Sequence, residues 1–136
     1  MKHIIPIGVR DYLPEEVKKR EITIQKVANV FNKNGFEPVT TPLFEYWSTI
    51  QPLCNKKLKK QSIRFMNSNG RMLVIRPDHT IAIARLAATR LKHENGPFKF
   101  YYSDAVYRLD DTTGETEHYQ LGVECIGING VSEEVN

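Results

Sequence analysis

The sequence contains only two cysteines among its 136 residues, Cys54 and Cys125. They lie far apart and neither belongs to a Cys-x-x-Cys pair, so the sequence supports neither a disulfide framework nor a zinc knuckle. It also lacks the run of about 18 apolar residues that a membrane span needs, and its first residues lack the apolar core of a signal peptide. We therefore expect a cytoplasmic protein with reduced thiols and no membrane partner.

Motifs for metal binding and for common catalytic sites are missing as well. The four histidines, His3, His79, His93 and His118, do not show the four-residue spacing with a third ligand that is typical of helical metal sites. The chain has no glycine-rich phosphate loop and no Ser–His or Cys–His signature. We expect no metal site and no catalytic residue.

The charge of the chain gives little support for a nucleic-acid partner. The sequence has 19 basic and 16 acidic residues, and its formal net charge is +3. Four of the basic residues form one run, so the rest of the chain is close to neutral; they are Lys56, Lys57, Lys59 and Lys60. Such a run is typical of a solvated face or a mobile loop, with a nucleic-acid contact as the alternative. We predict that nucleic acid is not a partner.

The length and the hydrophobic content of 40% fit one globular domain, and we treat residues 1–136 as a single unit. Leu13-Pro14-Glu15-Glu16 predicts a helix start, because proline needs no amide partner in the first turn and carboxylates favour the positive helix end. Asn34-Gly35 predicts its end. A strand is expected over residues 36–40, stopped by Pro42.

The remaining elements are predicted from turn signals and from β-rich or alanine-rich runs. They are a hairpin of strands 62–66 and 71–76 across Asn67-Ser68-Asn69-Gly70, a helix over 80–92, strands over 99–108 and 119–127, a polar loop over 110–117, and a loop with at most one helical turn over 43–61. This predicts an α+β fold, mainly antiparallel strands with flanking helices. A helix start at Ser132-Glu133-Glu134 indicates that the chain is a fragment, with its sheet incomplete at the C-terminus.

Three segments, taken in order, resemble the catalytic fold of the class II aminoacyl-tRNA synthetases. They are Gly35 to Glu45, Leu73 to Thr80, and Val106 to Glu124 across the polar loop. The similarity is closest to the histidyl-tRNA synthetase group, whose amino terminus Gly8 to Pro14 also resembles, and it covers about the first third of a family member. Within the group, Arg76-Pro77-Asp78 and Ala84 to Leu91 look more like the regulatory subunits of ATP phosphoribosyltransferase, which have lost aminoacylation.

The resemblance implies a pocket for free histidine. Asp78 and Thr80 would lie at its ammonium group, Arg108 at its carboxylate, and Gln120 and Glu124 on the pocket floor. Gln120 and Glu124 alternate along one strand and therefore share a face. We place His118 on the opposite face, unless a bulge intervenes.

Four of the five pocket residues also have a structural interpretation. Asp78 is suited to cap the helix that begins near Thr80. Arg108 and Glu124 are suited to form an ion pair across neighbouring strands. Gln120 is acceptable as a polar residue of an edge strand.

The polar loop argues against ATP activation. In the synthetases, this hairpin holds ATP with arginines, whereas here Asp110 stands at the second ATP-site position as a vestige and the loop has no arginine. Carboxylates oppose the binding of a triphosphate.

We therefore predict a non-catalytic regulatory subunit without a cofactor. It would bind histidine, assemble with the short-form catalytic ATP phosphoribosyltransferase subunit, and activate or feedback-regulate the first step of histidine biosynthesis. A homodimer would form through the region Gly35 to Trp47. The alternatives are a fragment of a histidine–tRNA ligase that uses ATP and Mg²⁺, and a synthetase-like binding module with another partner.

Overall fold

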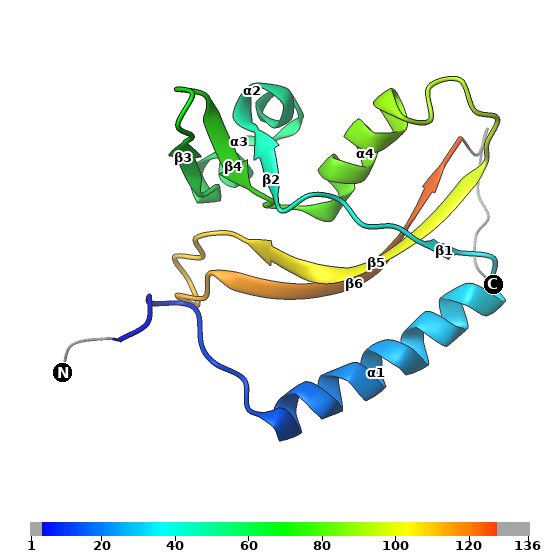
Figure 1. Ribbon diagram of the computed structural model, residues 1–136, viewed down its shortest axis with the longest axis horizontal. Coiled ribbons are helices and arrows are strands. Elements are labelled where there is room, and N and C mark those ends of the chain that lie inside the picture. The colour runs from blue at the N-terminus through cyan, green and yellow to red at the C-terminus, as the bar shows by residue number, and fades with distance from the viewer. Residues whose placement is uncertain (1–3, 128–136) are drawn as a thin grey trace.

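A long antiparallel strand pair lies at the centre of the structure, a computed structural model that describes residues 4–127. Strand β5 (Phe98–Tyr107) pairs with β6 (Glu117–Ile126) in a continuous register, with Phe98 opposite Ile126 and Tyr107 opposite Glu117. Figure 1 shows helix α1 beneath this pair and helix α4 with a smaller sheet above it. The predicted α+β architecture and its two long strands are confirmed.

The strand expected over residues 36–40 is shorter than predicted. Only β1 (Glu37–Pro38) is paired, and it runs parallel to β5 at the edge of the sheet. Pro38 has no N–H to donate, so it interrupts the hydrogen bonding that a longer strand needs. The next amide, of Val39, still donates to the Tyr101 carbonyl at 2.9 Å. The sheet is therefore mixed rather than wholly antiparallel.

Helix α1 (Pro14–Lys33) covers the lower face of the sheet and has the predicted ends. The amide of Leu13 donates to the carboxylate of Glu16 at 3.0 Å, which holds the first turn. Gly35 follows the helix with a φ of +80°, the left-handed conformation that glycine tolerates. Phe31 packs on Tyr101 of β5, with ring centroids 5.6 Å apart.

The predicted hairpin forms the smaller sheet. Strands β3 (Arg64–Met66) and β4 (Met72–Ile75) are antiparallel, and the side chain of Asn67 accepts hydrogen bonds from two amides of the turn between them. Strand β2 (Phe44–Tyr46) pairs with the other edge of β4. The sheet order is therefore β2–β4–β3.

The segment 43–61 is more ordered than the sequence predicted. Besides β2 it contains α2 (Trp47–Ile50), the 3-10 helix η1 (Gln51–Leu53) and α3 (Lys56–Gln61). The lysine run is therefore helical rather than a mobile loop. Asn55 caps α3 by accepting from the Leu58 amide at 2.8 Å.

Burial explains why this segment folds. Trp47, Ile50 and Cys54 pack with Val74 of β4 in one buried cluster. The short helices are thus held by long-range packing, because elements of four to six residues are too short to be stable alone. The helix predicted over 80–92 is α4 (His79–Thr89). The helix start expected at Ser132 lies outside the described residues.

Candidate functional site

Asp78 stands where β4 leads into α4, and its carboxylate caps that helix. The Ile81 amide donates to Asp78 Oδ1 at 3.2 Å. Asp78 therefore caps α4, as its structural interpretation predicts. It does not exclude binding, because a carboxylate has a second oxygen that can accept from a ligand.

Thr80 and Glu124 form the closest link between α4 and the sheet. The Thr80 hydroxyl donates to Glu124 Oε1 at 2.5 Å. Glu124 is half-buried on β6. Two of the predicted residues, 44 positions apart in the chain, are therefore in direct contact.

The face of β6 that meets α4 also carries Gln120, as predicted, and Gly122. The β5–β6 register is continuous, so alternate residues of β6 share this face. A Cβ atom at Gly122 would lie 2.5 Å from the Tyr102 hydroxyl oxygen, so glycine leaves the space that the tyrosine ring occupies. Gln120 is half-buried opposite Asp104. It belongs to an edge strand of the described sheet, which agrees with its structural interpretation.

The prediction that His118 lies on the face opposite the pocket is wrong. The same register pairs it with Val106 and puts it on the side of Gln120 and Glu124, because no bulge intervenes. Its Nε2 is buried and has no hydrogen-bond partner within residues 4–127. His118 is therefore a neighbour of the candidate site.

Arg108 lies at the other end of the site, in an open pocket of about 300 Å³. Helix α3, the start of α4 and the beginning of the β5–β6 loop line this pocket. The lining residues are Asn55, Lys57, Leu58, Gln61, Asp78, Arg108 and Asp110. Asp78 thus connects the pocket of Arg108 to the contact of Thr80 with Glu124.

The register excludes the predicted ion pair between Arg108 and Glu124. Glu124 lies opposite Phe100, and Arg108 follows Phe100 by eight positions. At about 3.3 Å per residue, this places the two Cα atoms roughly 26 Å apart along a straight strand. The candidate site is therefore elongated. The carboxylate of Glu124 lies at one end, that of Asp78 in the middle, and the guanidinium of Arg108 at the other end.

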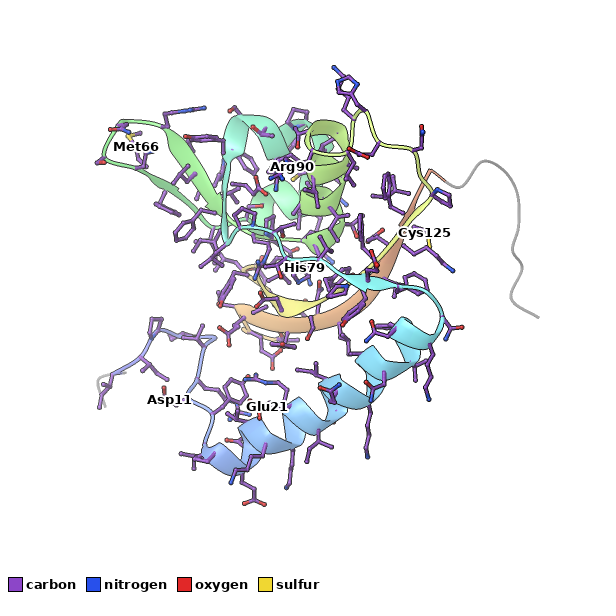
Figure 2. All side chains as sticks on the ribbon, turned by 45° about the vertical axis from the view of Figure 1, so that its right-hand side comes forward. Asp11, Glu21, Met66, His79, Arg90 and Cys125 are labelled. Atoms are coloured by element: carbon purple, nitrogen blue, oxygen red, sulfur yellow. The ribbon has the colours of Figure 1, made fainter. Side chains whose placement is uncertain are left out.

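A buried polar cluster supports the middle of the site. Figure 2 shows His79 where α4 meets the sheet. Its ring stacks on Tyr102, with centroids 4.3 Å apart, and its Nε2 lies 3.0 Å from the Asp104 carbonyl. Buried Arg76 donates to the Ala105 and Thr41 carbonyls. These contacts fix the chain on both sides of Asp78.

The surroundings of His79 affect its protonation. Burial lowers the pKa of the imidazole, and the Arg76 guanidinium lowers it further. The hydrogen bond to the Asp104 carbonyl and the nearby carboxylates oppose this shift only in part. At neutral pH, the folded protein therefore favours the neutral form of this imidazole.

The β5–β6 loop uses its first carboxylate for its own folding. Asp110 Oδ1 accepts from the amides of Thr112 at 2.8 Å and Thr113 at 3.3 Å. These backbone hydrogen bonds lower the pKa of Asp110. Asp111 pairs with Lys60 of α3 at 3.8 Å, between two exposed side chains.

Two contributors to the site are not among the predicted residues. Lys57 lines the pocket of Arg108, although it was assigned to a solvated run. His79 was considered only as a possible metal ligand. The helix cap at Asn55 was a local signal for α3, but no local signal shows that α3 lies beside Arg108. Within residues 4–127, no group of three or more histidine, cysteine or acidic side chains is arranged to hold a metal ion.

Comparison with known proteins identifies the family. The model of the family described as "Histidyl-tRNA synthetase" matches residues 8–136. The chain belongs to the histidyl-tRNA synthetase family. A solved structure from Bacillus halodurans C, described as an ATP phosphoribosyltransferase regulatory subunit/histidyl-tRNA synthetase, has a TM-score of 0.81 and 34% identity over 92% of this chain and 33% of that one. The predicted synthetase-like fold is confirmed.

The relatives of this family member carry two different names. The histidine–tRNA ligase of Pyrococcus abyssi is 34% identical over 93% of this chain and 30% of its own length. The ATP phosphoribosyltransferase regulatory subunit of Moorella thermoacetica is 35% identical over 96% of this chain and 34% of its own length. The chain thus spans about a third of the length of the relatives it matches, and identity alone does not separate the two names.

Among residues 4–127, the structure contains no helix that could span a membrane.

Proposed function

We propose that this member of the histidyl-tRNA synthetase family is a regulatory subunit of ATP phosphoribosyltransferase. Residues 1–136 would form the amino-terminal part of its synthetase-like domain. The whole protein would bind histidine in the cytoplasm and activate or feedback-regulate the first step of histidine biosynthesis without being an enzyme itself. Relatives named as such regulatory subunits, at 31–36% identity, support this proposal.

The β5–β6 loop is the observation that carries the choice of a regulatory role. It closes tightly, with the Gly114 amide donating to the Asp110 carbonyl at 2.8 Å and the Asp110 amide donating to the Glu115 carbonyl at 3.2 Å. The loop presents carboxylates and no arginine. A triphosphate would meet like charges there, and the loop has no guanidinium to offset them. The protein would therefore bind an amino acid without activating it.

Histidine would occupy the elongated site between α4 and β6. Its cationic ammonium and its polar ring require carboxylate and amide partners, which Asp78, Glu124 and Gln120 supply. Thr80 already orients one oxygen of Glu124. One histidine molecule is too short to contact both Glu124 and Arg108, which lie roughly 26 Å apart along the strand, so Arg108 would receive its carboxylate only where the ammonium lies at Asp78.

Partner contacts are proposed for the short-form catalytic ATP phosphoribosyltransferase subunit and for a second copy of this chain. The region Gly35 to Trp47 contains exposed Phe44 and Tyr46, which suit a dimer contact. Trp47 does not, because it is 8% exposed and packs inside its own chain. Any dimer contact in this region would therefore rest on β2 rather than on α2.

Reconstitution with a short-form catalytic subunit tests the proposal. The whole protein should raise phosphoribosyl transfer, and added histidine should suppress that activation. ATP–pyrophosphate exchange should show no dependence on histidine. Strong histidine-dependent exchange would overturn the regulatory role and establish the ligase, the alternative supported by relatives of that name. A binding module with another partner would show neither activity.

A further inference from the structure

The short helix α3 is held beside Arg108 by the backbone. The Leu109 amide donates to the Gln61 carbonyl at 2.8 Å, and Ser62 forms a β-bridge with Arg108 itself. Ser62 in turn donates from its hydroxyl to the Leu58 carbonyl at 2.6 Å. The last turn of α3 is thus fixed to the end of β5. This attachment brings Lys57 to the pocket that Arg108 lines.

The charged groups of this pocket differ in how far they are already used. Asp78 Oδ1 accepts from the Ile81 amide, and Asp110 Oδ1 accepts from two amides of its own loop. Both carboxylates therefore take part in local folding, although the backbone hydrogen bonds also favour the ionised form of Asp110. In contrast, within residues 4–127 the side chains of Lys57 and Arg108 form no ion pair or hydrogen bond. Both residues line an open pocket of about 300 Å³.

We infer that Lys57 and Arg108 together bind one oxyanion, which makes Lys57 a ligand-binding residue of the site. A guanidinium offers a planar pair of donors to a carboxylate or a phosphate, and an ammonium adds a second point charge. The side-chain amides of Asn55 and Gln61 line the same pocket and can donate as well. This inference rests on the proposed function only in that Arg108 belongs to its ligand site.

The oxyanion has two possible sources. One is the carboxylate of the amino acid, with the ammonium near Asp78. The other is a phosphate group beyond the amino acid, because Arg108 lies roughly 26 Å along the strand from the residue opposite Glu124. Both place an oxyanion between the same two cations. Probes that carry only one of these groups distinguish them.

The test compares Lys57→Gln with Lys56→Gln in the whole protein. Both lysines lie in the first turn of α3 and are exposed, so each substitution removes the same charge at the same helix end. Only Lys57 lines the pocket. Calorimetric titrations would use L-histidine, L-histidinamide, which lacks the carboxylate, and inorganic pyrophosphate. Lys57→Arg keeps the charge and should restore binding.

We expect Lys57→Gln to weaken binding of histidine or of pyrophosphate about tenfold, with no such loss in Lys56→Gln. Weaker binding of histidine but not of histidinamide identifies the carboxylate, and weaker binding of pyrophosphate identifies a phosphate. Equal affinities in the two lysine variants for every probe, or no binding of any probe by the parent, would overturn the inference.

The outcome for the proposed function is separate. A parent protein that binds pyrophosphate through Lys57 but binds no histidine keeps the oxyanion site and removes histidine regulation. A parent that binds histidine with equal affinity in both variants, and shows no Lys57 effect on pyrophosphate, keeps histidine regulation and removes the oxyanion site.

Discussion

Thr80 donates a 2.5 Å hydrogen bond to Glu124 and so joins the first turn of α4 to β6. The bond uses one carboxylate oxygen of Glu124 and leaves the other for the cationic nitrogen of a ligand. This contact ties the strand face that carries Gln120 to α4, the helix that Asp78 caps. The proposed histidine site depends on it.

Substitutions at this contact should weaken histidine binding to different degrees. Glu124→Gln removes a charge-assisted hydrogen bond and should lower affinity about ten- to hundredfold. Thr80→Val removes only the orienting hydroxyl and should cost about fivefold. Thr89→Val is the control, because the Thr89 hydroxyl bonds within α4 to the Arg85 carbonyl. Calorimetry on the whole protein measures these affinities, and full affinity in Glu124→Gln would place histidine elsewhere.

Asp78→Asn separates binding from helix capping. Asparagine caps a helix about as well as aspartate, so the melting temperature should stay close to that of the parent. The loss of the charge should reduce histidine affinity about tenfold. Asp78→Ala should lower stability by about 0.5–2 kcal/mol because it also removes the cap to Ile81. An unchanged histidine affinity in Asp78→Asn would leave the residue a capping role alone.

Gly8→Ala should detach the amino-terminal segment from the β5–β6 loop. Gly8 has a φ of +90°, its carbonyl accepts from the Thr116 amide at 2.8 Å, and an added Cβ would clash with Thr116 Oγ1 and the Gly114 carbonyl. Gly35→Ala is the control, since its φ is +80° but nothing lies within 4 Å of an added Cβ.

Both changes introduce a strained backbone conformation, costing about 1 kcal/mol or more. Only Gly8→Ala adds the clash, so it should lose more unfolding free energy than Gly35→Ala. It should also speed hydrogen exchange of the Thr116 amide. Equal losses and unchanged exchange would show that the contact does not hold the loop.

Stability should depend on pH through His79. Its pKa in the folded state is lowered, mainly by burial, whereas the same imidazole in the unfolded chain has a pKa of about 6.5. The unfolded state therefore binds more protons as pH falls below about 6.5, so the free energy of unfolding should decrease toward the lower native pKa. Urea unfolding from about pH 7.5 to about pH 5.5 measures this slope. The stability advantage of the parent over His79→Gln should shrink across this range.

His93→Asn serves as the control for that titration, because His93 is exposed. It should keep the pH dependence of the parent. A parallel pH dependence in His79→Gln and the parent would show that another group carries the slope.

Phe44 should contribute to self-association. It is 51% exposed and packs edge-on against Phe65 across the small sheet, with ring centroids 5.3 Å apart. Phe44→Lys should shift the whole protein toward the monomer in sedimentation experiments, because it places a charge on an apolar contact. Val30→Lys is the control. Val30 is exposed on α1, and the β5–β6 pair lies between α1 and the small sheet (Figure 1). Association unaffected by Phe44→Lys would move the interface away from β2.

Local signals in the sequence were sufficient for the elements that depend on them. Pro14 and Gly35 mark the ends of α1, and Asn67 with Gly70 forms the predicted turn, because each residue favours the backbone conformation it adopts. The alternation along β6 also predicted that Gln120 and Glu124 share a face. The family resemblance then selected candidate residues that these patterns alone do not distinguish from capping or edge positions.

Tertiary structure decided what these residues contact. The strand register separates Arg108 from Glu124, and the packing of Trp47 and Cys54 against β4 makes helices of a segment that lacks strong local signals. The bond from Leu109 to Gln61 then brings Lys57 to the pocket of Arg108. Such contacts arise between segments far apart in the chain, where burial and hydrogen bonding determine the arrangement and local conformational preference does not.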